Sequence, residues 1–194
     1  PKQASTWGQD YMRFHSYMNS GALMALSKVA KQASGGKLVG AFYGYVQDVV
    51  RCAYAGHLGW DRLLKCPDID FFAAPKSYRQ CGAGMPGGEM CPGASVNLHK
   101  LWVDECDNRT HRSNETRLFP TENMEQTWTV HWREWAKNVS HDSGLWYMDL
   151  GIGWFDEKGI MDNIARIVRA NKRVRKIHHR SVAQILHVID MDSK

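Results

Sequence analysis

The sequence predicts an α/β protein in which strands and helices alternate to build a parallel sheet. Segments with apolar residues at three- and four-residue spacing, typical of helices, alternate with short apolar runs rich in aromatic residues, typical of strands. These runs are apolar at nearly every position, as expected for parallel strands buried on both faces. With 194 residues, of which 43% are hydrophobic and 23% charged, the chain is long enough for one domain with a sizeable core.

The N-terminal half is expected to begin with a long helix over residues 9–32. Tyr11, Phe14 and Met18 recur at helical spacing within it, and the pair Gly35-Gly36 is expected to end it. The elements expected next are a strand at 37–46, a helix within 56–66 that Pro67 ends, and a strand at 69–75.

The C-terminal half continues the alternation. A Gly/Pro-rich loop at 81–93 is long enough to be functional, and Thr121 is expected to cap a helix over 122–139. The other expected elements are strands at 98–105, 144–151 and 181–190, a polar loop at 106–120, and a helix at 156–174.

Polar or aromatic side chains follow each of the first four strands. In parallel α/β folds, the loops at the carboxyl ends of the strands build the active site, so we expect these side chains to converge. The glycine-rich stretch SGGKLVG precedes a strand instead of following one, so no phosphate-binding loop is expected. The residues at the four strand ends are Tyr43 and Tyr45, Lys76 and Tyr78, Asp104 and Glu105, and Asp149 and Trp154.

Glu105 is the candidate chemical group among them. A carboxylate at the end of a buried strand is held rigidly and is partly desolvated, which suits a nucleophile or a general acid/base. The alternative is a loop carboxylate paired with one of the arginines that follow. A retaining glycosidase needs a second carboxyl group about 5 Å away. Asp104 points to the opposite face of a strand, whereas Asp107 or Asp149 could lie close.

Other site types have weaker support in the sequence. Asp104, Glu105, Asp107 and His111 offer metal ligands, but their spacing matches no EF-hand or His-Glu-x-x-His pattern, so no metal or cofactor is expected. The net charge of +5 is concentrated in residues 166–180, which fit a solvated helix face better than a nucleic-acid patch. No apolar run reaches the roughly 18 residues of a membrane span, so no membrane partner is expected.

The aromatic and cysteine contents leave alternatives open. Eight tryptophans and seven tyrosines fit either a Trp-rich core or a carbohydrate site, where aromatic faces stack on sugars. Among five cysteines, Cys81 and Cys91 could be bridged in an oxidising compartment, or all could be thiols. No signal peptide stands at the start, but the chain begins with Pro, so both cytoplasmic and secreted locations remain open.

Six segments resemble parts of a known family. The stretches KLWVDE and SGLWYMDLGIGWFDE are similar to the last two barrel strands of clan A glycoside hydrolases, in particular the beta-galactosidase-like group of family 42 and its relatives. The stretch DYMRFHSYMNSGAL, with Arg13-Phe14-His15-Ser16, resembles the helix after the fourth strand. Residues 37–46 and 67–78 resemble the fifth and sixth strands, and SVAQILHVIDMDS resembles the first strand of the following domain. Asp104 replaces a methionine of the family pattern.

The resemblance implies that residues 1–177 form the C-terminal half of a TIM (β/α)8 barrel and that 178–194 open a second α/β domain. It places Glu105 as the nucleophile of a retaining glycosidase, with the acid/base Glu upstream of this chain. A half barrel exposes two sheet edges and apolar surface, so either another copy or a missing N-terminal half is expected to cover it, and this fragment alone is expected to be inactive. The implied sugar contacts are Tyr43, Tyr45, Tyr78, Asp107, His111, Trp146, Asp149 and Trp154.

Two alternatives to a glycosidase remain. The first is a non-catalytic carbohydrate-binding or scaffolding protein built on a degenerate barrel, in which saccharide binding survives the loss of Glu105. The second is a metal-dependent hydrolase, whose activity a chelator removes.

Overall fold

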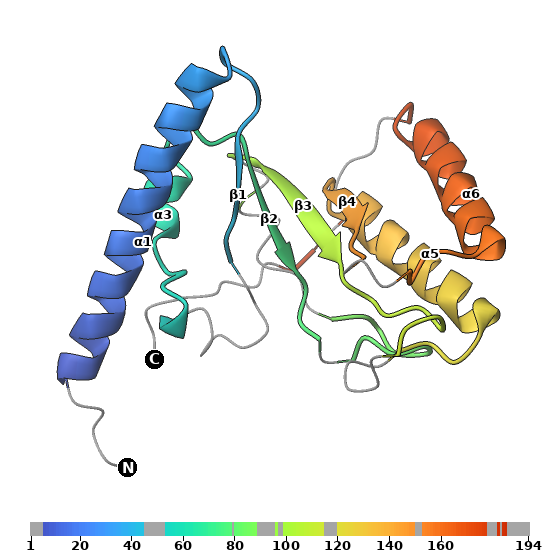
Figure 1. Cartoon of the computed structure of the whole chain (residues 1–194). Coiled ribbons are helices and arrows are strands. Elements are labelled where there is room, and N and C mark those ends of the chain that lie inside the picture. The colour runs from blue at the N-terminus through green and yellow to red at the C-terminus, as the bar shows by residue number, and fades with distance from the viewer. Residues whose placement is uncertain are drawn as a thin grey trace.

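The computed structural model describes residues 6–44, 53–78, 80–88, 96, 99–114, 120–149, 153–177, 182 and 184–185. Within these residues, four strands form one sheet in the order β1-β2-β3-β4, and every neighbouring pair is parallel (Figure 1). The predicted α/β class and parallel sheet are therefore confirmed. The strands are β1 (Gly40–Phe42), β2 (Phe71–Pro75), β3 (Leu101–Cys106) and β4 (Gly144–Tyr147).

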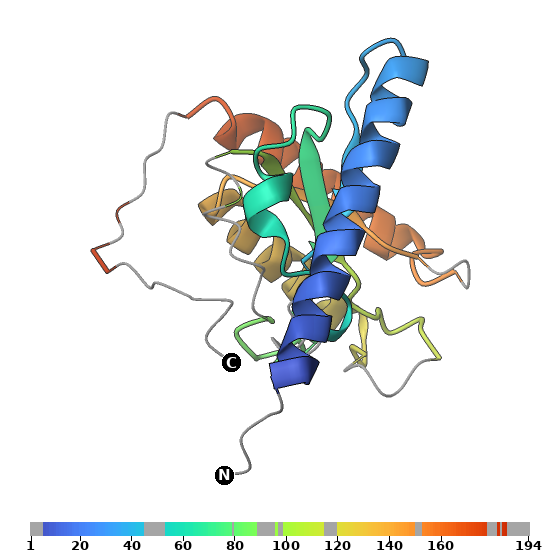
Figure 2. The same ribbon diagram turned by 90° about the vertical axis from the view of Figure 1, so that its left-hand side faces the viewer.

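The helices flank the sheet in two groups. Figure 1 shows α1 (Thr6–Ala33) and α3 (Trp60–Leu63) beside β1, with α5 (Met124–Ser140) and α6 (Lys158–Val174) beside β4. Figure 2, viewed from the α1 side, shows α1 in front of the sheet. Because the strand order never reverses, right-handed connections bring the helices to the same face of the sheet. The other face is left without a covering helix among the described residues.

The long first helix ends where the sequence predicts. Gly35 and Gly36 adopt left-handed φ angles of 68° and 84°, which a side chain would make strained. The Gly36 amide donates to the Lys31 carbonyl at 2.9 Å, and the Gly35 amide donates to the Gln32 carbonyl at 3.2 Å. These two bonds satisfy carbonyls of the last helical turn, so the glycine pair is a C-terminal cap.

Several elements are shorter than predicted. The helix expected within 56–66 is the four-residue α3. The strand expected at 37–46 is ordered as a strand only over Gly40–Phe42; Gly44 turns away with φ 85°, and Tyr45 lies outside the described residues. The strand expected at 144–151 ends at Tyr147, because its neighbour β3 ends at the paired residue Cys106. Edge strands lose their ladder where their single neighbour stops.

The predicted cap of the α5 helix is wrong. Asn123, not Thr121, is the N-cap, and its side chain accepts a hydrogen bond from the Gln126 amide at 3.0 Å. The Thr121 hydroxyl instead bonds the Thr127 hydroxyl at 2.6 Å and donates to the Arg109 carbonyl at 3.4 Å. Thr121 is buried, so its hydroxyl serves interior groups instead of the helix end.

The expected fifth strand at 181–190, and with it most of the expected domain at 178–194, lies outside the described residues. The described positions Val182, Gln184 and Ile185 carry neither helix nor strand, and Val182 and Ile185 are exposed.

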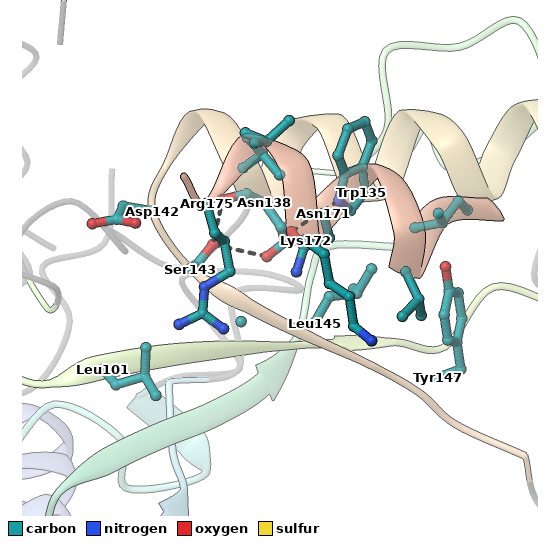
Figure 3. Close-up of a pocket in the computed structure, with 15 residues that line it drawn as sticks. Leu101, Trp135, Asn138, Asp142, Ser143, Leu145, Tyr147, Asn171, Lys172 and Arg175 are labelled. Atoms are coloured by element: carbon teal, nitrogen blue, oxygen red, sulfur yellow. Dashed lines mark hydrogen bonds between the residues drawn. The ribbon is translucent and has the colours of Figure 1, made fainter. Parts of the chain in front are cut away.

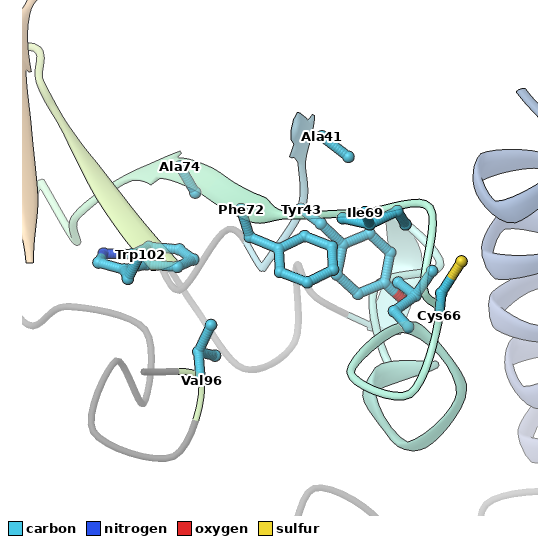
Figure 4. Close-up of a cluster of buried hydrophobic side chains, with 9 residues drawn as sticks. Ala41, Tyr43, Cys66, Ile69, Phe72, Ala74, Val96 and Trp102 are labelled. Carbon is cyan, nitrogen blue, oxygen red and sulfur yellow. The ribbon is translucent and has the colours of Figure 1, made fainter. Parts of the chain in front are cut away.

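The main apolar core lies between the sheet and the helices. Side chains of alternate strand residues point into it, and Leu23 and Met24 of α1 pack against it. Trp102 of β3 and Phe72 of β2 are fully buried there. The labelled core residues in Figure 4 are Ala41, Tyr43, Cys66, Ile69, Phe72, Ala74, Val96 and Trp102.

The opposite face of the sheet carries several apolar side chains that remain partly exposed. Phe42 is 51% exposed, Leu101 49% and Trp146 37%. Phe42 and Trp146 lie on the two edge strands, yet their ring centroids are 6.1 Å apart in an edge-to-face arrangement. Because neighbouring strands are spaced by about 4.8 Å, three spacings would separate these rings in a flat sheet. The sheet therefore curves toward this face, which we call the concave face.

Helix α1 also presents an apolar stripe to solvent. It buries Ser16, Ser20 and Ser27 against the domain. None of the described helices combines the length and apolar character that a bilayer crossing requires. The exposed apolar residues of α1 include Trp7, Tyr11, Phe14, Met18, Leu26 and Val29.

Asp70 connects three elements at the start of the sheet. Its carboxylate accepts from the Val39 amide at 2.7 Å and from the Lys31 ammonium of α1. Its carbonyl accepts from the Leu101 amide at 3.2 Å, at the start of β3. The hydrogen bond and charge of Lys31, followed by the Val39 amide, lower the pKa of the Asp70 carboxyl. Asp70 thus fixes α1 and β1 relative to β2.

We predict that Asp70→Asn lowers the free energy of unfolding by about 1–2 kcal/mol at pH 7, since a charge-assisted bond to Lys31 is lost. Because the folded-state pKa of Asp70 is lowered, its contribution is present above the unfolded pKa and is lost as pH falls through the folded value. The difference between variant and wild type should therefore shrink toward pH 2–3 in urea denaturation. Asp68→Asn is the matched control, and an equal loss in both variants would contradict the assignment.

Candidate active site

Glu105 projects from the carboxyl end of β3 toward the concave face. Successive strand residues alternate between faces, so Leu101, Val103 and Glu105 share the concave face, whereas Trp102 and Asp104 point toward the helices. In the register of the sheet, Glu105 stands between Pro75 of β2 and Trp146 of β4. Its side chain is nevertheless largely shielded, with only 5% of the residue exposed.

A small pocket, too narrow to hold a water molecule, surrounds this carboxylate. The loop after β2 and the loop after β3 form its walls, so it lies at the carboxyl-end edge of the sheet, where parallel α/β proteins place their active sites. Tyr78 and Asp107, both predicted site residues, lie in it together with Glu105. The full lining is Pro75, Lys76, Tyr78, Cys81, Glu105, Asp107 and Asn108.

Asp107 is held on both sides. Arg109 Nη1 lies 2.5 Å from Asp107 Oδ1, and the Tyr78 hydroxyl donates to Oδ2 of the same carboxylate. The Arg109 guanidinium lies over the Trp154 ring, 4.8 Å from its centroid. Burial, followed by the bond to Asp107, raises the pKa of Tyr78, so its hydroxyl keeps the proton that it donates. Both carboxylate oxygens of Asp107 are therefore engaged.

Glu105 has a strongly perturbed acidity. Burial, followed by the negative charges of Asp107 and Asp104, raises its pKa to about 7. Arg109, the cation nearest to Glu105 in the sequence, is paired with Asp107 instead of Glu105. Arg109 therefore does not support the alternative in which Glu105 is a loop carboxylate paired with a following arginine. A carboxyl group that titrates near neutrality suits proton transfer at the pocket.

A buried ion pair includes Lys76, one of the residues that line the pocket. The Lys76 ammonium contacts the Glu134 carboxylate of α5, and the two residues are 3% and 0% exposed. Burial alone would lower the pKa of Lys76, but Cys106, Glu134 and Asp104 raise it overall. The pKa of Glu134 is lowered, because the attraction of Lys76 and Arg133 outweighs its burial. This pair is therefore ionised at neutral pH.

Asp104 belongs to this buried group and not to the pocket. It is fully buried, and the Asn138 amide of α5 donates to its Oδ2 at 3.0 Å. Burial raises the pKa of Asp104 despite the opposing charge of Lys76. The strand alternation that separates Asp104 from Glu105 was predicted from the sequence, and the opposite placement of the two side chains confirms it.

The remaining predicted site residues are placed away from Glu105 or support it indirectly. Tyr43 lies in the helix-side core, where its hydroxyl donates to the Gly56 carbonyl at 3.1 Å and accepts from the Gly59 amide at 2.7 Å. Trp154 is buried and stacks on Arg109, so it positions the Asp107 partner. Tyr45 lies outside the described residues.

Three further predicted residues lie at the ends of β3 and β4. His111 bonds the Thr127 hydroxyl through Nδ1 and Glu157 through Nε2, each at 2.9 Å, so it joins α5 to the start of α6. Asp149 is exposed after β4 and does not line the pocket. Trp146 shares the concave face with Glu105 at the adjacent register position.

A larger cavity of about 480 Å³ lies on the helix side of β4, between α5 and α6 (Figure 3). Its charged lining residues Asp142, Lys172 and Arg175 are exposed, and most of its wall is apolar. Glu105 does not contribute to it. The cavity therefore reflects loose packing of α6 on the sheet and holds no buried acid or base.

The buried polar residues of α5 were not predicted from the sequence to lie near the site. Thr127, His131, Glu134 and Asn138 are buried at steps of four, three and four residues, which is one face of a helix. Burial lowers the pKa of His131 to about 4, so this imidazole is neutral. Two features of the sequence could have indicated this buried polar group: the helical spacing of these residues, and the position of Lys76 at the end of a strand.

Among the residues that the structure describes, no group of three or more His, Cys, Asp or Glu side chains is arranged to hold a metal ion. Comparisons of the chain with known protein families, with curated proteins and with solved structures find no match.

We predict that Lys76→Met destabilises the fold by about 3–5 kcal/mol, because it leaves the Glu134 carboxylate buried beside a single remaining cation. Glu134→Gln should be destabilising for the same reason. The double variant should lose less than the sum of the two single losses, since neither charge then remains unpaired. Denaturant unfolding of the four proteins measures this coupling, and strictly additive losses would rule out the pair as a unit.

We further predict that Asp107→Asn lowers the pKa of Glu105 from its value of about 7, because a neighbouring negative charge is removed while burial remains. A carbon-detected NMR titration of the glutamate carboxyl groups measures this change. Asp162→Asn, on the exposed side of α6, is the control and should leave Glu105 unchanged.

The same raised pKa has a consequence for stability. Because the folded state favours protonated Glu105, the free energy of unfolding should fall as pH rises from about 4.5 toward 7. Glu105→Gln should remove this part of the pH dependence. An identical dependence in wild type and in Glu105→Gln would contradict the perturbed acidity.

Proposed function

We propose that this chain carries the nucleophile half of a retaining glycoside hydrolase site, with Glu105 as the nucleophile. The observation that carries the proposal is the position of Glu105, which ends a buried parallel strand and points to the concave face. Tyr78 and Asp107 line the same pocket, and Trp146 lies at the adjacent strand position. This is the arrangement that the resemblance to beta-galactosidase-like hydrolases implies.

In this mechanism, ionised Glu105 attacks the anomeric carbon, and the glycosidic bond to the leaving group breaks. The product is a covalent glycosyl-enzyme that water then hydrolyses. Asp107 is a poor proton donor for the leaving oxygen, because Arg109 and Tyr78 occupy both of its carboxylate oxygens. The acid/base carboxyl group is therefore assigned to a residue outside the described part of this chain.

The shape of the sheet supports a half barrel. Four parallel strands follow one another without reversal, and the sheet curves toward the face that lacks helices. Both features are expected of strands five to eight of a (β/α)8 barrel. The partly exposed Phe42, Leu101 and Trp146 would then be interior residues, and a further set of strands, from another part of the polypeptide or from a second copy, would cover them.

A second candidate function is carbohydrate binding without catalysis. The observation that favours it is the acidity of Glu105, since a carboxyl group with a pKa of about 7 is only half ionised at neutral pH. A protonated carboxyl group and the exposed rings of Phe42 and Trp146 can hold a sugar without attacking it. Saccharide binding that survives Glu105→Gln, with no hydrolysis in wild type, would favour this function.

The test of the proposed nucleophile is made in the native protein with a 4-nitrophenyl β-galactoside. Glu105→Ala should lower hydrolysis by roughly 10⁴-fold, because the covalent intermediate can no longer form. Added azide should restore release of nitrophenol and give the α-glycosyl azide, since the small anion enters the space of the missing carboxylate. Asp162→Asn is the matched control and should keep full activity.

Two outcomes would contradict the assignment. Wild-type hydrolysis in Glu105→Ala would remove Glu105 from the chemistry. A β-glycosyl azide would assign Glu105 the acid/base role, because azide would then attack an intermediate formed on another carboxylate.

A further inference from the structure

Helix α5 holds the loop that follows β2 through two cations, of which Arg133 makes most of the contacts. The Arg133 guanidinium donates to the carbonyls of Cys81 at 2.8 Å, Gly82 at 2.7 Å and Met85 at 2.9 Å. One turn further along α5, the Lys137 ammonium donates to the Gly88 carbonyl. Residues 80–88, which we call the α5-held loop, thus direct four backbone carbonyls at two cations of one helix.

The α5-held loop is closed on itself. The Gly87 amide donates to the Gln80 carbonyl at 3.0 Å, and the Met85 amide donates to the Gly82 carbonyl at 3.3 Å. Gly88 packs so closely on the preceding segment that a Cβ atom there would lie 1.6 Å from the Ser77 carbonyl oxygen. The carbonyls that Arg133 collects therefore belong to one compact turn, and they move together.

The Arg133 guanidinium is itself fixed by the neighbouring Glu134 carboxylate. Its Nε and Nη2 atoms lie 2.9 Å and 2.5 Å from Glu134 Oε1, and Glu134 is fully buried. Glu134 also contacts Lys76, which directly follows β2. The guanidinium is therefore tied to the end of the same strand from which the loop leaves.

The α5-held loop contributes one residue, Cys81, to the wall of the Glu105 pocket. Cys81 and Asn108 both line the pocket, and the Cys81 carbonyl that accepts from Arg133 also accepts from the Asn108 side chain at 3.5 Å. The Cys81 thiol donates to the Ser77 carbonyl at 2.8 Å, which fixes the first turn of the loop. Any displacement of the loop therefore moves Cys81 and releases Asn108, and both line the pocket.

We propose that Arg133 is a positioning residue, which holds the α5-held loop as a fixed wall of the Glu105 pocket and so sets how tightly the site binds its saccharide. The inference rests on the proposed function for the identity of the ligand, but not for the mechanical role of Arg133. Arg133 does not line the pocket and acts through the loop. A lysine at this position keeps the charge beside Glu134 but cannot present several donors in a planar fork.

The test compares Arg133→Lys with Arg62→Lys. Arg62 also donates to a backbone carbonyl, that of Tyr17 at 2.9 Å, but it joins α3 to α1, away from the pocket. Hydrogen–deuterium exchange of the peptide that covers residues 80–88 reports on the loop without any ligand. Arg133→Lys should speed this exchange by about 10-fold or more, because the closed loop opens locally, while α5 and the strands keep wild-type exchange. Arg62→Lys should leave the loop unchanged.

Steady-state kinetics with a 4-nitrophenyl β-galactoside, in the native protein, gives the second readout. Arg133→Lys should raise KM by roughly 5- to 10-fold and change kcat by less than about 2-fold, since a wall that binds substrate and transition state equally affects binding alone. Lys137→Met, which removes the contact to the Gly88 carbonyl, should shift exchange and KM in the same direction.

The outcomes separate this inference from the proposed function. Unchanged loop exchange in both Arg133→Lys and Lys137→Met would overturn the positioning role. Faster exchange with unchanged KM would overturn the role in saccharide binding. Faster exchange in a protein whose wild type hydrolyses no glycoside would overturn the proposed function and leave the positioning role standing.

Discussion

The ion pair between Lys76 and Glu134 is the contact on which the site depends. It joins the end of β2 to the middle of α5 in a place that water does not reach, where either charge alone would be strongly unfavourable. Two consequences follow. Glu134 fixes Arg133 and through it the α5-held loop, and Asp104 is kept on the same buried side by Asn138 of α5. The helix thus sets the distance between the strand ends and the loops that wall the pocket.

The order of the strands explains why Glu105 lies on the face of the sheet opposite to the helices. Because the sheet grows in one direction, its right-handed connections lie on one face, and the side chains of the concave face meet no described helix. Trp102 and Asp104 are buried on the helix side, whereas Glu105 is shielded by the loops after β2 and β3, and Trp146 is left partly exposed. Strand alternation therefore divides β3 into a face buried by helices and a face that carries the proposed nucleophile.

The elements could be predicted because their signals are local. The glycine pair ended α1 as expected, and apolar runs located β2 and β3 to within a few residues. The cap of α5 could not be predicted, because Thr121 and Asn123 are both good N-caps and the choice depends on the buried partner Thr127. Glu105 and Asp107 were found from their place after a strand, but Tyr43 was not distinguishable from a site residue, because its burial depends on packing against α3 and His57.

The cations in and beside the pocket are paired with carboxylates other than Glu105. Arg109 pairs with Asp107, and Lys76 pairs with Glu134. These two cations, which lie in or beside the pocket, therefore neutralise other carboxylates. Burial without a cation of its own accounts for the raised pKa of Glu105. The proposed nucleophile would need its charge at the moment of attack, so a group that covers the concave face would have to favour the ionised form, by a positive charge or by hydrogen bonds to the carboxylate. Under the proposed function, covering the concave face would therefore complete the chemistry of Glu105 as well as the half barrel.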